Sequence, residues 1–271
     1  MTVKRRNHEV PKGLLKNWLG NRGTVKGFHH VDLSTQDLRF EEGREAQFAI
    51  TDYLYVPKRI DGRRDDSLED WFSVDENGLA QFARSAAAGK LQSFKNQKLL
   101  NQAIRGCIAL GSRNAYSMYM ATQAMHPVNQ SMHELSVANV LNSIALKFKM
   151  FASWQFTILY DLPVPLLINE RPFMETTPLR LESVAMPLSP RTLMVGTPNG
   201  VPGETRMKIS WFQAGPEHCN IAEIVNHFTL EMARQWIVAN SYEELDGLQS
   251  ELTSERLGER MQTDKIIGFQ T

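Results

Sequence analysis

Apolar residues at helical spacing, followed by alternating apolar and polar residues, define the first part of the chain. The helical spacing lies between Pro11 and Gly20, residue types that suit the start and the end of a helix. Residues 25–33 and 46–56 then alternate, which predicts two strands. A charged stretch between residues 57 and 67 contains Gly62 and predicts a solvated loop.

The pattern becomes helical from residue 68 to residue 124. Residues 68–72 and 78–87 are amphipathic, and we expect a break or a cap between Asp75 and Gly78. A longer helix follows, and its apolar face contains Gly106 and Gly111. Glycine lowers helix propensity, so this pair predicts close packing of the helix against another element.

A third helix is expected to start at Ser131, because Ser131 and Glu134 form a capping-box pattern. Its apolar stripe runs to Phe151. The next segment, residues 154–196, reads as two hairpin-like strand pairs. Their turns contain Asn-Glu-Arg-Pro at 169–172 and Pro-Leu-Ser-Pro at 187–190. Polar, proline-containing corners of this kind are where binding groups often lie.

Residues 207–214 predict a further strand, and Asn220 with Glu223 predicts the start of a long final helix whose apolar stripe runs to Trp236. Trp154, Phe156 and Ile158 should share one face of their strand, because side chains two residues apart do so. We expect that face to pack on the stripe of the final helix.

These elements predict an α+β fold. A mixed or antiparallel sheet would pack against a helical middle region, residues 66–152, and against the long C-terminal helix. No linker rich in proline, glycine or serine separates the parts, so residues 1–271 are expected to form a single domain.

Composition restricts the classes of function. Of 271 residues, 42% are hydrophobic, and 30 basic residues balance 30 acidic ones, which argues against a generally basic nucleic-acid binder. Cys107 and Cys219 are far apart and match no metal or redox spacing, as expected in a reducing cytoplasm. No apolar run approaches the roughly 18 residues that span a bilayer, and no signal peptide is recognisable. We therefore expect a cytoplasmic protein without membrane partners.

His8 is the first candidate for chemistry. It lies just ahead of the first helix, and imidazole titrates near neutral pH, so it could act as a general acid or base. The alternative is that His8 orders the N-terminal segment through a backbone hydrogen bond. Lys12, in the same segment, is a candidate for substrate binding.

The turn at 169–172 is the second candidate. Glu170 could act as a base or a metal ligand, and Arg171 could bind a phosphate with two hydrogen bonds. Asn169 is a further candidate for substrate binding. The alternative is an ordinary turn with an internal ion pair. Arg113 follows an apolar helical face and needs a partner, either a carboxylate such as Glu170 or a ligand phosphate, although a structural salt bridge also explains it.

Recognised metal motifs are absent from the sequence. His29 and His30 are neighbours in a predicted strand, so they point to opposite faces, and His218 and His227 are too far apart on a helix to bind one ion. The sequence contains no HExxH, Walker or CxxC pattern. The metal ligands, if the protein has any, are therefore unknown at this stage.

Several segments, in their order along most of the chain, resemble a bacterial family known as domain of unknown function 4238. The similar segments include HEVPKGLLKNWL, LEDWFSVDENGLAQF, PLLINERPF, VAMPLSPRTLMVG and VNHFTLEMARQWIVANS. Where that family usually has an aspartate in the turn, this chain has Asn169 and Glu170. The resemblance implies a bacterial protein and carries over no activity.

Two functions remain open. The first is a nuclease or other phosphodiesterase in which His8 is the acid/base, Glu170 the base or metal ligand, and Arg113 or Arg171 the phosphate ligand. A divalent metal would be its cofactor only if Glu170 is a ligand. The second is a non-enzymatic interaction or regulatory protein whose polar turns are structural. The first predicts that His8, Arg113 and residues 169–171 line one cleft.

Overall fold

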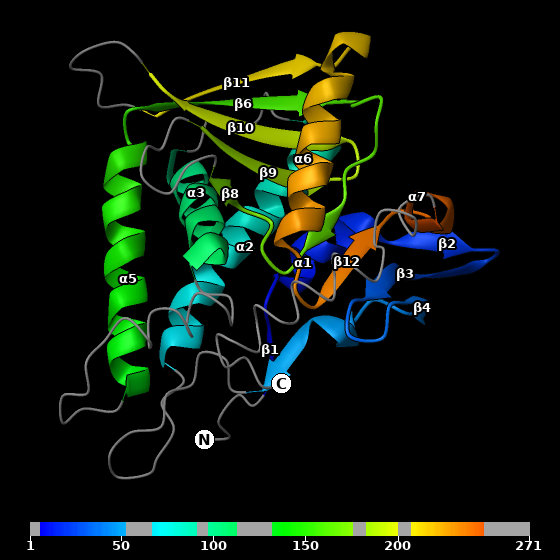
Figure 1. Ribbon diagram of the computed structural model, residues 1–271. Coiled ribbons are helices and arrows are strands. Elements are labelled where there is room, and N and C mark those ends of the chain that lie inside the picture. Colours follow the sequence, from blue (N-terminus) through cyan, green and yellow to red (C-terminus); the bar gives the residue numbers. More distant parts are fainter. Residues whose placement is uncertain are drawn as a thin grey trace.

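The computed structural model describes residues 6–52, 67–90, 97–112, 132–175, 183–199 and 207–246. Two five-stranded sheets and several helices make up this part of the chain (Figure 1). The α+β class predicted from the sequence is therefore confirmed. Arg113, Ser131 and residues 53–66 lie outside the described residues.

The first sheet, called the β6 sheet below, has the strand order β11-β6-β10-β9-β8. Its strands are β6 (Trp154–Tyr160), β8 (Met174–Glu175), β9 (Val184–Ser189), β10 (Thr192–Pro198) and β11 (Lys208–Gln213). Strand β11 runs parallel to β6 and the other pairs are antiparallel. The hairpin with the Pro-Leu-Ser-Pro turn is confirmed, since β9 pairs with β10.

The second sheet, called the β3 sheet below, joins distant parts of the chain. It has the order β2-β3-β12-β7, and β4 also pairs with β3. Its strands are β2 (Gly20–Arg22), β3 (Val25–Asp32), β4 (Asp37–Glu42), β7 (Ile168–Asn169) and β12 (Trp236–Ala239). The expected hairpin with the Asn-Glu-Arg-Pro turn is wrong, because the strands on either side of that turn lie in different sheets: β7 pairs with β12 and β8 pairs with β9.

The N-terminal segment forms a small ribbon and a short helix. Strand β1 (Arg6–His8) pairs with β5 (Ile50–Asp52), and α1 (Lys12–Leu15) continues into the 3-10 helix η1 (Lys16–Trp18), as predicted. The strand predicted to begin at residue 46 is interrupted, because Ala46 has a positive φ and Gln47–Ala49 form the 3-10 helix η2.

Three long helices, α2 (Ser67–Ala87), α3 (Gln97–Ser112) and α5 (Met132–Phe151), supply the helical middle region. Helix α2 is continuous, so the expected break between Asp75 and Gly78 is wrong. The carboxylate of Asp75 points instead to α3 and pairs with Arg105 at 3.0 Å. A carboxylate with such a partner can lie in the middle of a helix without capping one.

The two glycines of α3 lie at close contacts. A Cβ atom on Gly106 would lie 2.8 Å from the carbonyl oxygen of Asp75, and one on Gly111 would lie 2.8 Å from Cδ1 of Phe173. The predicted role of these glycines in close packing is confirmed, because either position leaves too little space for a methyl group.

Helix α6 (Cys219–Met232), which follows the 3-10 helix η4 (Pro216–His218), lies on one face of the β6 sheet (Figure 1). Ala222 and Val225 pack there with Leu159 and Leu193. The helix begins one residue before Asn220, whose side chain forms no cap. The short helix α7 (Tyr242–Asp246) ends the described part of the chain.

The packing predicted for the final helix is wrong in two respects. Trp154, Phe156 and Ile158 do share a face, but that face belongs to the core that also contains side chains of α2, α3 and α5. The closing helix ends at Met232, and Trp236 lies in β12, where the apolar run Trp236–Ala239 pairs on both sides. Phe228, expected in the core, is 39% exposed.

The largest hydrophobic cluster extends from Val10 to Val238 and contains side chains of both sheets and of all three middle helices. The division into a single domain over residues 1–271 stays a prediction. Within the described ranges, every helix is too short or too polar to cross a lipid bilayer.

Candidate functional site

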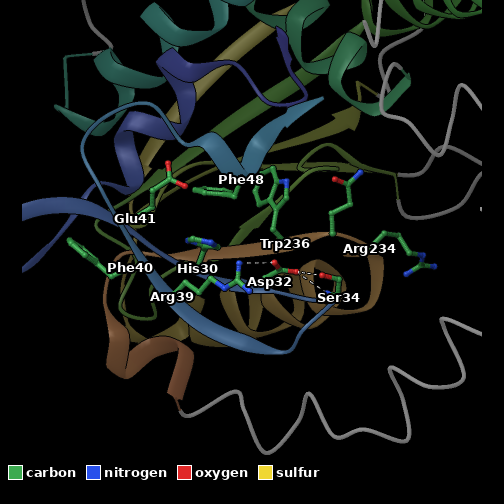
Figure 2. Close-up of a pocket in the computed structure, with 10 residues that line it drawn as sticks. His30, Asp32, Ser34, Arg39, Phe40, Glu41, Phe48, Arg234 and Trp236 are labelled. Carbon is green, nitrogen blue, oxygen red and sulfur yellow. Dashed lines mark hydrogen bonds and ion pairs between the residues drawn. The ribbon is translucent and has the colours of Figure 1, made fainter. Parts of the chain in front are cut away.

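A pocket of about 570 Å³ lies over one face of β3 and the start of β12. Its lining comes from β3, the β3–β4 turn, β4, η2 and the segment that leads into β12. The lining residues are His30, Asp32, Ser34, Arg39, Phe40, Glu41, Phe48, Arg234, Gln235 and Trp236. Figure 2 shows Phe40 and Glu41 at one end and Arg234 at the other.

Aromatic rings form the middle of the pocket. The rings of His30 and Phe48 stack, with centroids 4.2 Å apart and planes 18° apart, and Phe48 meets Trp236 edge-on at 5.3 Å. His30 is buried, and this burial lowers its pKa to about 4. The ring is therefore neutral at pH 7 and belongs to the apolar wall.

Charged side chains surround these rings. Arg39 forms ion pairs with Asp32 and Asp37, each at 3.1 Å. Burial would raise the pKa of Asp32, but hydrogen bonds from the hydroxyl and backbone N–H of Ser34, together with the charge of Arg39, lower it below its usual range. Asp32 is thus ionised at neutral pH and orients the guanidinium of Arg39 (Figure 2).

Two buried carboxyl groups lie behind the pocket and contact consecutive lining residues. The backbone N–H of Arg234 donates to Oε1 of Glu170 at 2.6 Å, and the side-chain amide of Gln235 donates to Oε1 of Glu9 at 3.1 Å. Glu9 and Glu170 are only 1% and 3% exposed. The N-terminal segment and the β7 turn therefore meet at residues 234–235.

Glu170 is the most strongly perturbed acid at this site. Its burial and the negative charge of Glu9 raise its pKa to about 7, against the opposing effects of the Arg234 N–H and the positive charge of Arg171. Its second oxygen, Oε2, is buried and has no hydrogen-bond partner among the described residues. At neutral pH the group is close to the midpoint of its titration.

Asn169, a predicted substrate-binding residue, is fully buried. Its side-chain amide donates to the carbonyl oxygen of Thr229 in α6 at 2.7 Å, and its oxygen accepts the N–H of Arg171 at 2.8 Å. These bonds connect the turn after β7 to the end of α6, which is a structural role.

The other predicted site residues lie apart from the pocket. His8 is half-buried in β1 and pairs with Ile50 across the ribbon, and Lys12 forms an exposed ion pair with Glu45 at 2.5 Å. Arg171 follows Glu170 directly, and none of these described residues is part of the lining. Only Glu170 reaches it, through the backbone of Arg234.

Several residues of the site were missed by the sequence reading. Glu9 had a detectable signal, because it is an acidic residue between His8 and the apolar pair Val10 and Pro11. Arg234 and Gln235 had none, since they read as polar positions of a continuing helix. Their role depends on the end of α6 at Met232 and the start of a strand at Trp236.

No group of three or more His, Cys, Asp or Glu side chains that could hold a metal ion occurs in the part of the chain that the structure describes. Glu9 and Glu170 form a pair of acids, with hydrogen-bond donors from residues 235 and 234.

No protein-family model, curated protein or solved structure matches the chain. The resemblance to domain of unknown function 4238 therefore stays a prediction.

Proposed function

We propose that the protein binds a small ligand with a planar ring and an anionic group, of the nucleotide class, in the pocket over β3 and β12. The observation that carries this proposal is that aromatic rings and two arginines, Arg39 and Arg234, line one concave site. Its volume of about 570 Å³ is within the range of pockets that enclose ligands of this size.

The aromatic wall of the pocket is the reason to expect a planar ring in the ligand. Phe40, Phe48 and Trp236 present ring surface to the pocket, and planar rings gain from offset-stacked or edge-on contact with such surfaces. The indole Nε1 of Trp236 is buried and has no hydrogen-bond partner among the described residues. An unsatisfied donor of this kind costs stability, and such costs are often found at functional sites.

The two arginines are the reason to expect an anionic group in the ligand. Arg39 already binds Asp32 and Asp37, and Arg234 donates to the carbonyl oxygens of Glu231 and Ala233. A guanidinium has five N–H donors in a planar fork, which suits it to a phosphate oxygen in addition to protein partners.

The charge balance limits the size of the anion. Asp32 and Glu41 offset Arg39 and Arg234 within the lining, and His30 is neutral. A pocket without net positive charge suits one small ligand better than a nucleic-acid strand, whose binding depends on several uncompensated cations. Such binding also suits a regulatory protein that senses its ligand.

Binding can be tested with a panel of nucleosides, nucleoside monophosphates, a dinucleoside monophosphate, inorganic phosphate and a short single-stranded RNA. Isothermal titration calorimetry should detect the phosphate-bearing compounds with a ring and not phosphate alone. Arg234→Ala should weaken this binding by about tenfold or more, because it removes charge-assisted hydrogen bonds. Arg84→Ala is the matched control, since Arg84 also donates to a backbone carbonyl but lies on α2. Absence of binding by every compound, or equal losses in both variants, would contradict the proposal.

Phosphodiester cleavage is a second candidate, and the observation in its favour is Glu170. An acid whose pKa is raised to about 7 beside a second carboxyl group is suited to general acid–base catalysis. Its side chain is buried behind Arg234 and Gln235, so a substrate could reach it only after this segment moves. Binding is therefore better supported than cleavage.

Cleavage has a direct test. If it occurs, Glu170→Gln should abolish hydrolysis of single-stranded RNA or DNA, and a catalytic His8 would show as the same loss in His8→Ala with the melting temperature nearly unchanged. A structural His8 would instead show as a loss of about 1–3 kcal/mol in the alanine variant. Assays with and without magnesium or manganese would also decide whether a divalent metal takes part. No hydrolysis under any condition would leave only the binding function.

A further inference from the structure

The two acids behind the pocket, Glu9 and Glu170, come from segments that are far apart in the sequence and contact the same lining segment. Glu9 comes from the segment before α1, Glu170 follows β7, and both accept hydrogen bonds from the segment that leads into β12. Residues 234 and 235 thus face the pocket with some atoms and the acid pair with others. A change of charge on the pair acts directly behind the place where an anion would bind.

The two oxygens of Glu170 have different surroundings. Oε1 accepts the N–H of Arg234 at 2.6 Å, whereas Oε2 is buried without a hydrogen-bond partner among the described residues. A proton on Oε2 would leave the bond from Arg234 intact. Protonation would therefore change the charge behind the pocket without releasing the segment that lines it.

We propose that binding of an anion in the pocket is coupled to uptake of one proton by Glu170, so that the ligand binds more tightly to the protonated protein. This inference rests on the proposed binding function. It goes beyond that function, because it assigns to the buried pair a regulatory role in the affinity of the site.

The sign of the coupling follows from the charges around Glu170. Among the described residues, Glu9 opposes its ionisation, and Arg171 and the N–H of Arg234 favour it. A negative ligand next to Arg234 adds a second opposing charge, so the proton is held more firmly in the complex. Coupling between two sites is reciprocal, and protonation must therefore tighten binding by the same factor.

The pH range is set by the free protein. The pKa of Glu170 is raised to about 7, so the affinity should fall as the pH rises through neutrality and level off on either side. His30, the histidine in the lining, has a pKa near 4 and does not titrate in this range. A loss of affinity of about fivefold to tenfold between pH 6 and pH 8 would be typical of such coupling.

The test uses the full chain and a dinucleoside monophosphate, whose phosphodiester stays singly ionised between pH 5.5 and 8.5. Isothermal titration calorimetry at several pH values gives the affinity, and repetition at pH 7 in buffers of different ionisation enthalpy counts the protons taken up. At pH 7 the wild-type protein should take up less than about half a proton, because Glu170 is already about half protonated there. Glu170→Gln should take up none and should bind with a pH-independent affinity close to the wild-type value at pH 6. Glu223→Gln, a change on an exposed face of α6, should keep the wild-type profile.

A second variant keeps the test decisive if Glu170→Gln folds poorly. Glu9→Gln retains an acceptor for Gln235 but removes the charge that opposes ionisation of Glu170, so the pH profile should shift to lower pH. Binding that does not depend on pH, affinity that rises with pH, or a slope that persists in Glu170→Gln would overturn the coupling and leave the binding function intact. No binding at any pH would overturn both.

Discussion

At the scale of single residues, three acidic side chains are buried away from solvent. Glu9, Asp75 and Glu170 are all at least 97% buried, and each has a hydrogen-bond partner on a distant segment. Asp75 has a full countercharge in Arg105, although desolvation still raises its pKa. Glu170 instead lies beside another acid, which is an unfavourable arrangement unless it holds a proton.

Glu170 should make the stability of the protein depend on pH. Its folded-state pKa is about 7 and its ordinary value is 4.5, so the folded state keeps a proton that the unfolded state releases. The contribution of this group to stability is therefore full below about pH 4.5 and is lost as the pH rises to about 7, by up to about 3 kcal/mol. Urea unfolding followed by tryptophan fluorescence should show a smaller fall in Glu170→Gln and an unchanged fall in Glu223→Gln. A wild-type stability that rises over this range in step with the variant would contradict the assignment.

At the scale of elements, the crossing of α2 and α3 depends on small side chains. Gly78 faces Gln102, and Gly106 faces the backbone of Asp75, so each helix has a glycine where the other approaches. The ion pair between Asp75 and Arg105 lies at the same crossing. The helices can approach closely because no Cβ atom separates them there.

Gly106→Ala should therefore destabilise the protein, although alanine favours helices. The added methyl group would lie 2.8 Å from the carbonyl oxygen of Asp75, and backbone cannot move aside as a flexible side chain can. Overpacking costs about 1–3 kcal/mol and the gain in helix propensity is about 1 kcal/mol, so a net loss of up to about 2 kcal/mol is expected. Chemical denaturation measures it, with Gln81→Ala on the exposed face of α2 as control. A stabilised Gly106→Ala variant would show that the helices can separate without loss.

At the scale of the whole molecule, the β3 sheet is what assembles the site. Strands β3 and β4 come from the first 42 residues, and β7 and β12 from beyond residue 167. Antiparallel pairing of β12 with both β3 and β7 brings residues 234–236 between the pocket and Glu170. The bonds of Asn169 and Asn226 to the backbone of neighbouring segments then connect the β7 region to α6.

Features that depend on neighbours along the chain could be predicted from the sequence. The first helix, the strand over residues 25–32, the hairpin at Ser189–Pro190 and the close contacts of Gly106 and Gly111 all follow from local spacing and from residue type. The α+β class follows from the order of these elements. Glu170 was also predicted as a site residue from its turn, because polar residues after an apolar run mark a sheet edge, and that role stays a prediction.

Contacts between distant segments could not be predicted in this way. Pairing of β7 with β12, in place of a hairpin around the Asn-Glu-Arg-Pro turn, placed Glu170 beside Glu9 and residues 234–235 instead of in an open cleft with His8. The end of α6 at Met232 made Trp236 a strand residue of the pocket. Strand pairing and burial are energies between residues that are far apart in sequence, and a local pattern of apolar and polar positions does not contain them.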